Sequence, residues 1–140
     1  MCGVLVVFAK KGQLNQDYCK KASEKIFSRG PDFNFSRFKL SNRLFLSQTV
    51  LSITGKPELN LEYSKSKNKR YEILFNGEIY NYKQLQSEYL DKKDLYNLSG
   101  SDTETIINLH QVLDPIKVRK IIEGMFAYII YDTHEDKLLI

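Results

Sequence analysis

The first residues of the chain combine two groups that could act together in catalysis. Cys2 follows the initiator Met1 and precedes Gly3 and the apolar run of residues 4–9. If Met1 is removed, Cys2 carries a thiol and a free α-amine, whose ordinary pKa values are about 8.5 and about 7.7–8.0. The amine can then serve as the base for its own thiol, without a separate histidine. A cysteine at position 2 is also often incidental. The rest of the chain must therefore decide whether Cys2 is a catalytic residue or an incidental one.

A second group of candidate residues, Asn76, Gly77 and Glu78, follows a predicted strand over residues 71–75. A side-chain amide and a neighbouring backbone N–H that are fixed at one place can stabilise a developing oxyanion. Asn-Gly after a strand is also the strongest local signal for a hairpin turn. These residues alone do not distinguish a hairpin turn from an oxyanion site.

Three further residues could take part in chemistry or only in structure. Asp102 lies at a predicted helix start, where it could cap the helix or bind an ammonium group. His110 lies on or beside the apolar face of that helix, and we interpret it as structural rather than catalytic. Cys19 lies on the apolar face of an earlier helix and is interpreted as a core thiol. No spacing of cysteine and histidine indicates a metal site.

Composition is typical of a soluble globular protein of one domain, with 140 residues, 42% hydrophobic and 27% charged residues and a net charge of +4. No apolar run exceeds about eight residues, and no signal peptide is recognisable, so we expect a cytoplasmic protein without a membrane span. The basic run Lys65–Arg70 contains no aromatic residues. It is interpreted as a solvated hairpin loop and not as a nucleic-acid site.

Periodicity places strands and helices along the whole chain. Strands are predicted at 4–9, 33–38, 44–46, 71–75, 126–131 and 137–140, with a hairpin turn at Ser41-Asn42. Helices are predicted at 15–28, 82–89, 101–113 and 115–122, with Asn15 and Ser101 as caps. The first helix should have an apolar face made of Tyr18, Cys19, Ala22 and Ile26. Helices grouped between mostly antiparallel strands favour the α+β class.

Six blocks of the sequence carry a resemblance to a known family. They are Met1-Cys2-Gly3, Arg29-Gly30-Pro31-Asp32, Leu51-Ser52-Ile53, Asn76-Gly77-Glu78-Ile79-Tyr80-Asn81, Gly100-Ser101-Asp102-Thr103-Glu104 and Gly124-Met125-Phe126-Ala127. In this order and at these separations they resemble the glutaminase domain of class II glutamine amidotransferases, above all that of glutamine-hydrolysing asparagine synthetases. The likeness extends over residues 1–140 and implies one glutaminase domain.

The resemblance implies a fold and a reaction. The fold would be the N-terminal-nucleophile hydrolase sandwich, with four αββα layers and mostly antiparallel sheets. Cys2 would attack the side-chain amide of glutamine and give a thioester and ammonia, with its own amine as base. Asn76 and Gly77 would form the oxyanion hole. The residues that the family pattern assigns to the substrate are Arg29, Leu51, Ile53, Glu78 and Asp102. Arg29 would also order Cys2, although residues 29–32 could be only a helix exit.

One departure from the family concerns the substrate carboxylate. The family usually has His-Glu-Arg where this chain has Gln48-Thr49-Val50, and its arginine clamps the α-carboxylate of glutamine. Loss of a charge-assisted bidentate contact predicts weak glutamine binding, unless Arg43, Lys56 or a residue outside this chain supplies the charge. The alternatives are a catalytically impaired regulatory or binding module, and a hydrolase of another amide without an α-carboxylate.

A second departure is length. In the family the domain continues into a synthetase domain that binds ATP and the ammonia acceptor. We therefore expect the chain to be a C-terminally truncated excerpt or a separate subunit, with ATP and Mg²⁺ belonging to the synthetase part and no cofactor here. The strand edge predicted at residues 138–140 could pair with a synthetase subunit or with a second copy of the chain.

Overall fold

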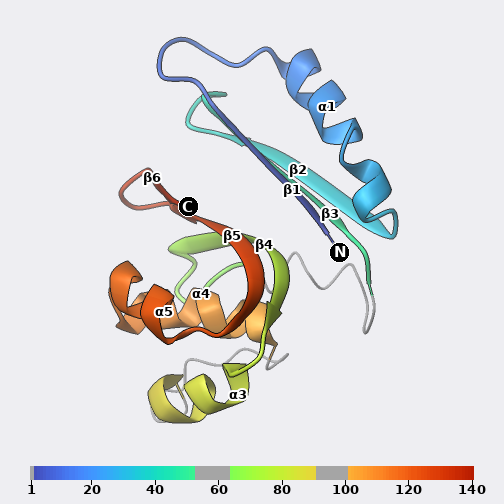
Figure 1. Cartoon of the computed structure of the whole chain (residues 1–140). Coiled ribbons are helices and arrows are strands. Elements are labelled where there is room, and N and C mark those ends of the chain that lie inside the picture. The colour runs from blue at the N-terminus through green and yellow to red at the C-terminus, as the bar shows by residue number, and fades with distance from the viewer. Residues whose placement is uncertain (1, 53–63, 91–100) are drawn as a thin grey trace. The chain divides into compact units, whose positions relative to one another are not determined.

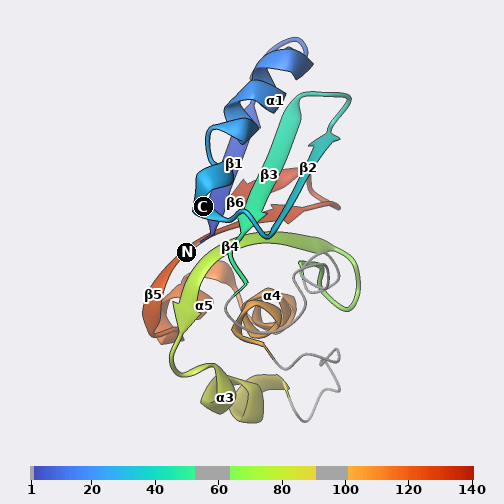
Figure 2. The same cartoon turned by 90° about the vertical axis from the view of Figure 1, so that its right-hand side faces the viewer.

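The computed structural model describes residues 2–52, 64–90 and 101–140 (Figure 1 and Figure 2). The chain divides into two compact units, of which unit 1 is Met1–Glu58 and unit 2 is Leu59–Ile140. Each unit has its own antiparallel sheet and its own helices.

The sheet of unit 1 has three strands in the order β1-β3-β2. They are β1 (Gly3–Phe8), β2 (Phe33–Lys39) and β3 (Leu44–Val50). The turn between β2 and β3 includes Ser41 and Asn42, both with positive φ. The predicted hairpin is confirmed, and both of its strands are longer than the sequence indicated. Because β3 is the central strand, its end at residues 49–50 lies beside the start of β1.

Helix α1 (Gln16–Glu24) lies along this sheet (Figure 2), and the Oγ atoms of Ser23 and Ser47 are 2.6 Å apart. Asn15 caps it as predicted, since its side chain accepts from the Tyr18 N–H at 3.1 Å. The helix ends earlier than residue 28 and is followed by a 3₁₀ turn, η1 (Phe27–Arg29). Cys19 is buried as expected, but Tyr18 is 72% exposed. The predicted apolar face is therefore wrong at Tyr18, because successive helical residues point about 100° apart.

The sheet of unit 2 has the order β4-β5-β6, with β4 (Tyr71–Ile79), β5 (Gly124–Asp132) and β6 (Lys137–Leu139). β4 extends four residues beyond the predicted strand over 71–75. The turn, one of the two interpretations that the sequence left open, does not form at Asn76-Gly77: Asn76 pairs with Ala127 and Gly77 with Phe126 in the β4–β5 ladder. Long-range pairing with β5 has overridden the local turn signal.

The helices of unit 2 are α3 (Tyr82–Leu85), which continues as a π-helical turn η3 (Gln86–Leu90), α4 (Asp102–Val112) and α5 (Pro115–Ile121). Ser101 caps α4 as predicted by accepting from the Glu104 N–H at 3.2 Å. The core of the unit lies between α4 and the sheet. Its fully buried members include Ile73, Ile79, Leu90, Ile106, Leu109, Val118 and Ile130.

The basic run Lys65–Arg70 is a turn segment in which Lys65, Lys67, Asn68 and Lys69 are exposed, as the predicted loop requires, whereas two of its residues are fixed by the fold. Ser66 is 2% exposed, and the Arg70 guanidinium bonds Asp132 through Nε at 3.0 Å and Nη2 at 2.6 Å. This contact holds the pKa of the Asp132 carboxyl at about 2. Arg70 thus joins the start of β4 to the end of β5 instead of facing a ligand.

Two antiparallel three-stranded sheets with helices packed on them confirm the α+β class. Helices and strands do not alternate as they do in a doubly wound parallel sheet. None of the helices in the described ranges is long and apolar enough to cross a membrane.

Candidate active site

Cys2 directly precedes β1 and is partly exposed. Its neighbour Gly3 donates its N–H to Thr49 Oγ1 at 3.2 Å, and the Thr49 hydroxyl donates to the Ile26 carbonyl at 3.0 Å. A Cβ atom on Gly3 would lie 2.7 Å from Thr49 Oγ1, so glycine permits this close approach. Thr49 therefore fixes the residue behind Cys2 to the central strand and to the segment after α1.

The segment from Arg29 to Asp32 also holds Cys2 in place. Arg29 Nε donates to the Cys2 carbonyl at 3.2 Å. A Cβ atom on Gly30 would lie 2.5 Å from the carbonyl carbon of Val50, and the Asp32 N–H donates to the Val50 oxygen at 3.2 Å. The segment is thus more than a helix exit, because it connects Cys2 to the end of β3.

Val50, at the position where the family resemblance implies a carboxylate-binding arginine, is buried in β3 at 4% exposure. Arg43 does not replace that arginine. Its guanidinium donates to the carbonyls of Ala9 and Lys10, at 3.3 and 3.0 Å. Arg43 stands seven residues before Val50, which corresponds to about 20 Å along a strand. The other predicted substitute, Lys56, lies outside the described residues.

The end of β3 carries two more predicted substrate residues. Leu51 directly follows the strand and is 38% exposed, so its side chain is available for contact. The Ser52 N–H donates to Asp32 Oδ2 at 2.7 Å, which holds this short segment to the loop that contains Arg29. Ile53 lies outside the described residues.

In unit 2 the predicted oxyanion residues lie within β4. Gly77 has φ +147°, and a Cβ atom there would lie 2.2 Å from the Met125 oxygen, so the backbone of β4 at this point requires glycine. The side chain of Asn76 has no hydrogen-bond partner among the described residues, and its Oδ1 is buried. A buried amide without a partner costs about 1–3 kcal/mol. A buried polar group without a partner needs an explanation, and a ligand that pairs with it when bound is one such explanation.

Asp102 lies next to the same end of β4. Its Oδ2 accepts from the Ile79 N–H at 3.1 Å and its Oδ1 accepts from the Thr103 N–H at 2.7 Å. Ile79 directly follows Glu78, which is exposed. The Asp102 carboxylate is thus held at the end of β4 at which Glu78 also lies, and two acidic residues at one strand end suit an ammonium group.

Asn81 is a positioning residue that the sequence reasoning did not single out. Its Nδ2 donates to the Ile121 carbonyl at 2.8 Å, and its Oδ1 accepts from the Glu123 N–H at 3.0 Å. The Tyr80 N–H also donates to the Glu123 oxygen, at 2.7 Å. The end of the 76–81 block therefore anchors β4 to the segment that leads into β5. The sequence signal that could have indicated this role is an asparagine placed between a predicted strand and a predicted helix.

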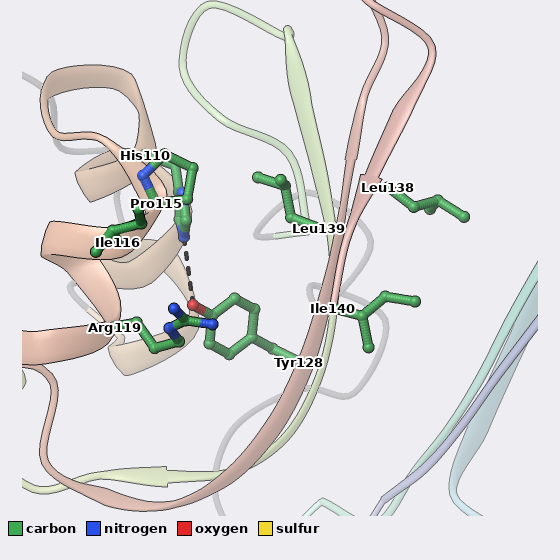
Figure 3. A pocket seen from close by; sticks show the side chains of 8 residues that line it. All are labelled: His110, Pro115, Ile116, Arg119, Tyr128, Leu138, Leu139 and Ile140. Atoms are coloured by element: carbon green, nitrogen blue, oxygen red, sulfur yellow. Dashed lines mark hydrogen bonds between the residues drawn. The ribbon is translucent and has the colours of Figure 1, made fainter.

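Unit 2 also contains a cavity of about 280 Å³ between α4, α5, β5 and β6. Its walls include His110, Arg119, Tyr128 and Leu139 (Figure 3). His110 Nε2 lies 3.5 Å from Tyr128 Oη, while burial lowers the pKa of His110 to about 4. None of the predicted site residues lines this cavity, and its neutral buried histidine agrees with a structural role for His110.

The predicted site residues thus form two groups. Unit 1 brings Cys2 and Arg29 together at the end of β3, and unit 2 brings Asn76, Glu78 and Asp102 to the end of β4. The described ranges contain no cluster of three or more His, Cys, Asp or Glu side chains that could hold a metal ion.

Comparison with known protein families identifies the domain to which these residues belong. A family model described as a glutamine amidotransferase domain matches residues 1–140. The chain belongs to this family. The six sequence blocks are therefore those of an amidotransferase domain, and the resemblance proposed from them is confirmed.

Curated relatives of this amidotransferase domain carry the name asparagine synthetase. Asparagine synthetase B [glutamine-hydrolyzing] of Escherichia coli (strain K12) is 33% identical over 100% of this chain and 24% of its own length. Asparagine synthetase [glutamine-hydrolyzing] 1 of Saccharomyces cerevisiae is 34% identical over 99% of this chain and 23% of its own length. The chain thus spans about a quarter of the relatives it matches.

Proposed function

We propose that this amidotransferase domain hydrolyses the side-chain amide of glutamine through Cys2 and supplies the ammonia to an ATP-dependent synthetase. The observation that carries the proposal is the anchoring of Cys2 at the start of β1. Arg29 holds its carbonyl at 3.2 Å, and Thr49 holds the following N–H. A partly exposed cysteine held in this way suits a nucleophile, because catalytic groups must be fixed before the reaction begins.

The proposed mechanism requires removal of Met1. The free α-amine of Cys2 accepts the thiol proton, and the thiolate adds to the amide carbon of glutamine. The Asn76 side-chain amide and the Gly77 N–H would stabilise the resulting oxyanion. The C–N bond then breaks, the proton passes from the amine to the leaving nitrogen, and ammonia departs. Water hydrolyses the thioester to glutamate and restores the thiol.

The remaining predicted residues are proposed to recognise the rest of the substrate. Glu78 and Asp102 would bind the α-ammonium group of glutamine, since they place two carboxylates at the end of β4. Leu51 and Ile53 would contact its carbon chain.

The acceptor of the ammonia is proposed from the relatives, whose names describe glutamine-hydrolysing synthesis of asparagine. A synthetase part that binds ATP and Mg²⁺ would activate the acceptor carboxylate. It would be a further part of the same polypeptide or a separate subunit, and the complete assembly could contain more than one copy of the chain. We propose a cytoplasmic location, where the free thiol of Cys2 stays reduced.

The test is ammonia release from L-glutamine by the protein and by its Cys2→Ala variant. We expect the variant to lose at least about 10³-fold in kcat, since nothing replaces the thioester step. Intact mass should show that Met1 is absent. Equal rates in the two proteins, or a retained methionine on the active form, would contradict the mechanism.

The burial of Val50 supports a second candidate. The protein could instead hydrolyse an amide without an α-carboxylate, or keep the fold as a binding module. The first alternative predicts Cys2-dependent ammonia release from simple amides but not from glutamine. The second predicts no Cys2-dependent turnover of glutamine or of simple amides.

A further inference from the structure

We propose that Arg29 binds the α-carboxylate of the substrate and thereby determines which amides reach Cys2. This inference rests on the proposed glutaminase function and concerns the same site. Glutamine carries a carboxylate only a few bonds from its amide, so a cation near the nucleophile residue is needed to recognise it.

The hydrogen bonds of Arg29 leave the required part of its guanidinium group available. Nε donates to the Cys2 carbonyl at 3.2 Å. Neither Nη1 nor Nη2 has a partner among residues 2–52, 64–90 and 101–140, and the side chain is exposed. The edge formed by the two terminal nitrogens presents parallel N–H donors, which is the geometry that binds a carboxylate through both of its oxygens.

The backbone that carries Arg29 is fixed. The Arg29 N–H donates to the Ile26 carbonyl at 3.1 Å, and the same carbonyl accepts from Thr49. On the other side, Gly30 packs directly against β3, where a Cβ atom would lie 2.5 Å from Val50. A cation on such a base loses less conformational freedom when a ligand binds than one on a loose loop.

Other basic residues of unit 1 are placed less well. Arg43 is engaged about 20 Å away along β3. Arg37 lies over the Phe35 ring at 5.0 Å and pairs with Leu46, three residues along β3 from Thr49. Among the described residues, Arg29 is the basic side chain that contacts Cys2.

The geometry gives one guanidinium group two tasks. One donor holds the carbonyl of the nucleophile residue, and the other edge would hold the substrate. A carboxylate bound there would also restrict the rotation of the side chain that positions Cys2. Substrates without the carboxylate would lose both the binding energy and this restriction.

The experiment compares L-glutamine with 4-aminobutanamide, which has the same amide and amine but no carboxylate. Steady-state kinetics are measured for the wild type, Arg29→Ala, Arg29→Lys and the matched control Arg43→Ala, whose guanidinium also binds backbone carbonyls. We expect Arg29→Ala to raise KM for glutamine about 10- to 100-fold and to leave KM for 4-aminobutanamide within about twofold. The KM of Arg29→Lys for glutamine should lie between those of the wild type and Arg29→Ala. Arg43→Ala should change the KM of neither substrate.

Two other outcomes separate this inference from the proposed function. If Arg29→Ala lowers kcat equally for both substrates and leaves both KM values unchanged, Arg29 only positions Cys2 and the inference is overturned. The glutaminase function would stand in that case. If the wild type shows no Cys2-dependent ammonia release from glutamine, the proposed function fails and the inference fails with it. Circular dichroism shows whether each variant is folded. If Arg29→Ala does not fold, the same comparison of KM values is made with Arg29→Lys.

Discussion

Unit 1 and unit 2 hold their polar side chains in different ways. Around Cys2 in unit 1, Arg29, Thr49 and Asp32 all have hydrogen-bond partners in the fold. The buried side-chain atoms without a partner in the described part of the chain are Asn76 Oδ1, Asn108 Nδ2 and His110 Nδ1, and all three belong to unit 2.

This difference indicates a division of tasks. In unit 1 the backbone around Cys2 is held by hydrogen bonds, and none of the described buried side-chain atoms of this unit lacks a partner. Unit 2 fixes its backbone through Gly77 and the β4–β5 ladder and leaves the Asn76 amide unpaired. Substitutions should therefore affect the two units differently, because unit 1 depends on side-chain contacts and this part of unit 2 depends on backbone shape.

The largest effect is expected for Gly77→Ala. The residue has φ +147°, and its new Cβ would lie 2.2 Å from the Met125 oxygen, a backbone atom that cannot move alone. We expect a loss of at least about 3 kcal/mol in the free energy of unfolding, measured by urea denaturation. The matched control is Gly12→Ala, at φ +67° with nothing within 4 Å. It should cost about 1–2 kcal/mol, and an equal cost in both variants would contradict the role of close approach.

Acid should reveal the cost of burying His110 in unit 2. Burial lowers the pKa of His110 to about 4, whereas an unfolded chain has about 6.5. Above pH 6.5 both states are neutral, and below it the unfolded state binds a proton that the folded state does not. The free energy of unfolding should therefore fall by about 3 kcal/mol between pH 6.5 and pH 4.

The His110→Phe variant should lack most of this slope. The pKa of Asp132, lowered to about 2 from 3.8 by Arg70, affects stability only below about pH 4, so the two groups act in separate ranges. An unchanged slope in His110→Phe would mean that another group takes up the proton.

A smaller effect is expected for Thr49→Val in unit 1. Valine keeps the shape but leaves the Gly3 N–H and the Ile26 carbonyl without the hydroxyl. We expect a loss of about 2 kcal/mol in unfolding free energy and a lower kcat. Thr49→Ser, which keeps the hydroxyl, should recover most of both. If serine were as damaging as valine, packing rather than hydrogen bonding would explain the contact.

The smallest effect is expected at Asn76, with the opposite sign. Asn76→Leu removes a buried, unpaired Oδ1 atom and puts an apolar group of similar shape in its place. The melting temperature should rise by a few degrees, corresponding to about 1 kcal/mol, while ammonia release falls by about 10²-fold. A lower melting temperature would show that the amide is satisfied in solution and would remove the contrast between the units.

Local signals in the sequence predicted a large part of this fold. The caps at Asn15 and Ser101 and the turn at Ser41-Asn42 depend on neighbouring residues, and all three are confirmed. The six blocks also identified the family before any contact was known.

The errors arose where distant residues decide the structure. Asn76-Gly77 has the composition of a hairpin turn, but pairing with β5 keeps it in the strand. The apolar pattern placed Tyr18 inside, whereas Cys19 is buried and Tyr18 is exposed. Arg43 was a candidate for the substrate carboxylate until the strand register placed it at the opposite end of β3. The contact of Arg29 with Cys2 was expected from the family resemblance, and no local signal around Arg29 indicates it.

Asn81 connects two segments 40 residues apart, since one amide bonds both Ile121 and Glu123. The Tyr80 N–H adds a third bond to the same place. Breaking any of these bonds alone would leave the others holding the backbone. The amide protons of Tyr80 and Glu123 should therefore exchange with deuterium together, as one opening event of the unit, and not one after the other as at a fraying strand end.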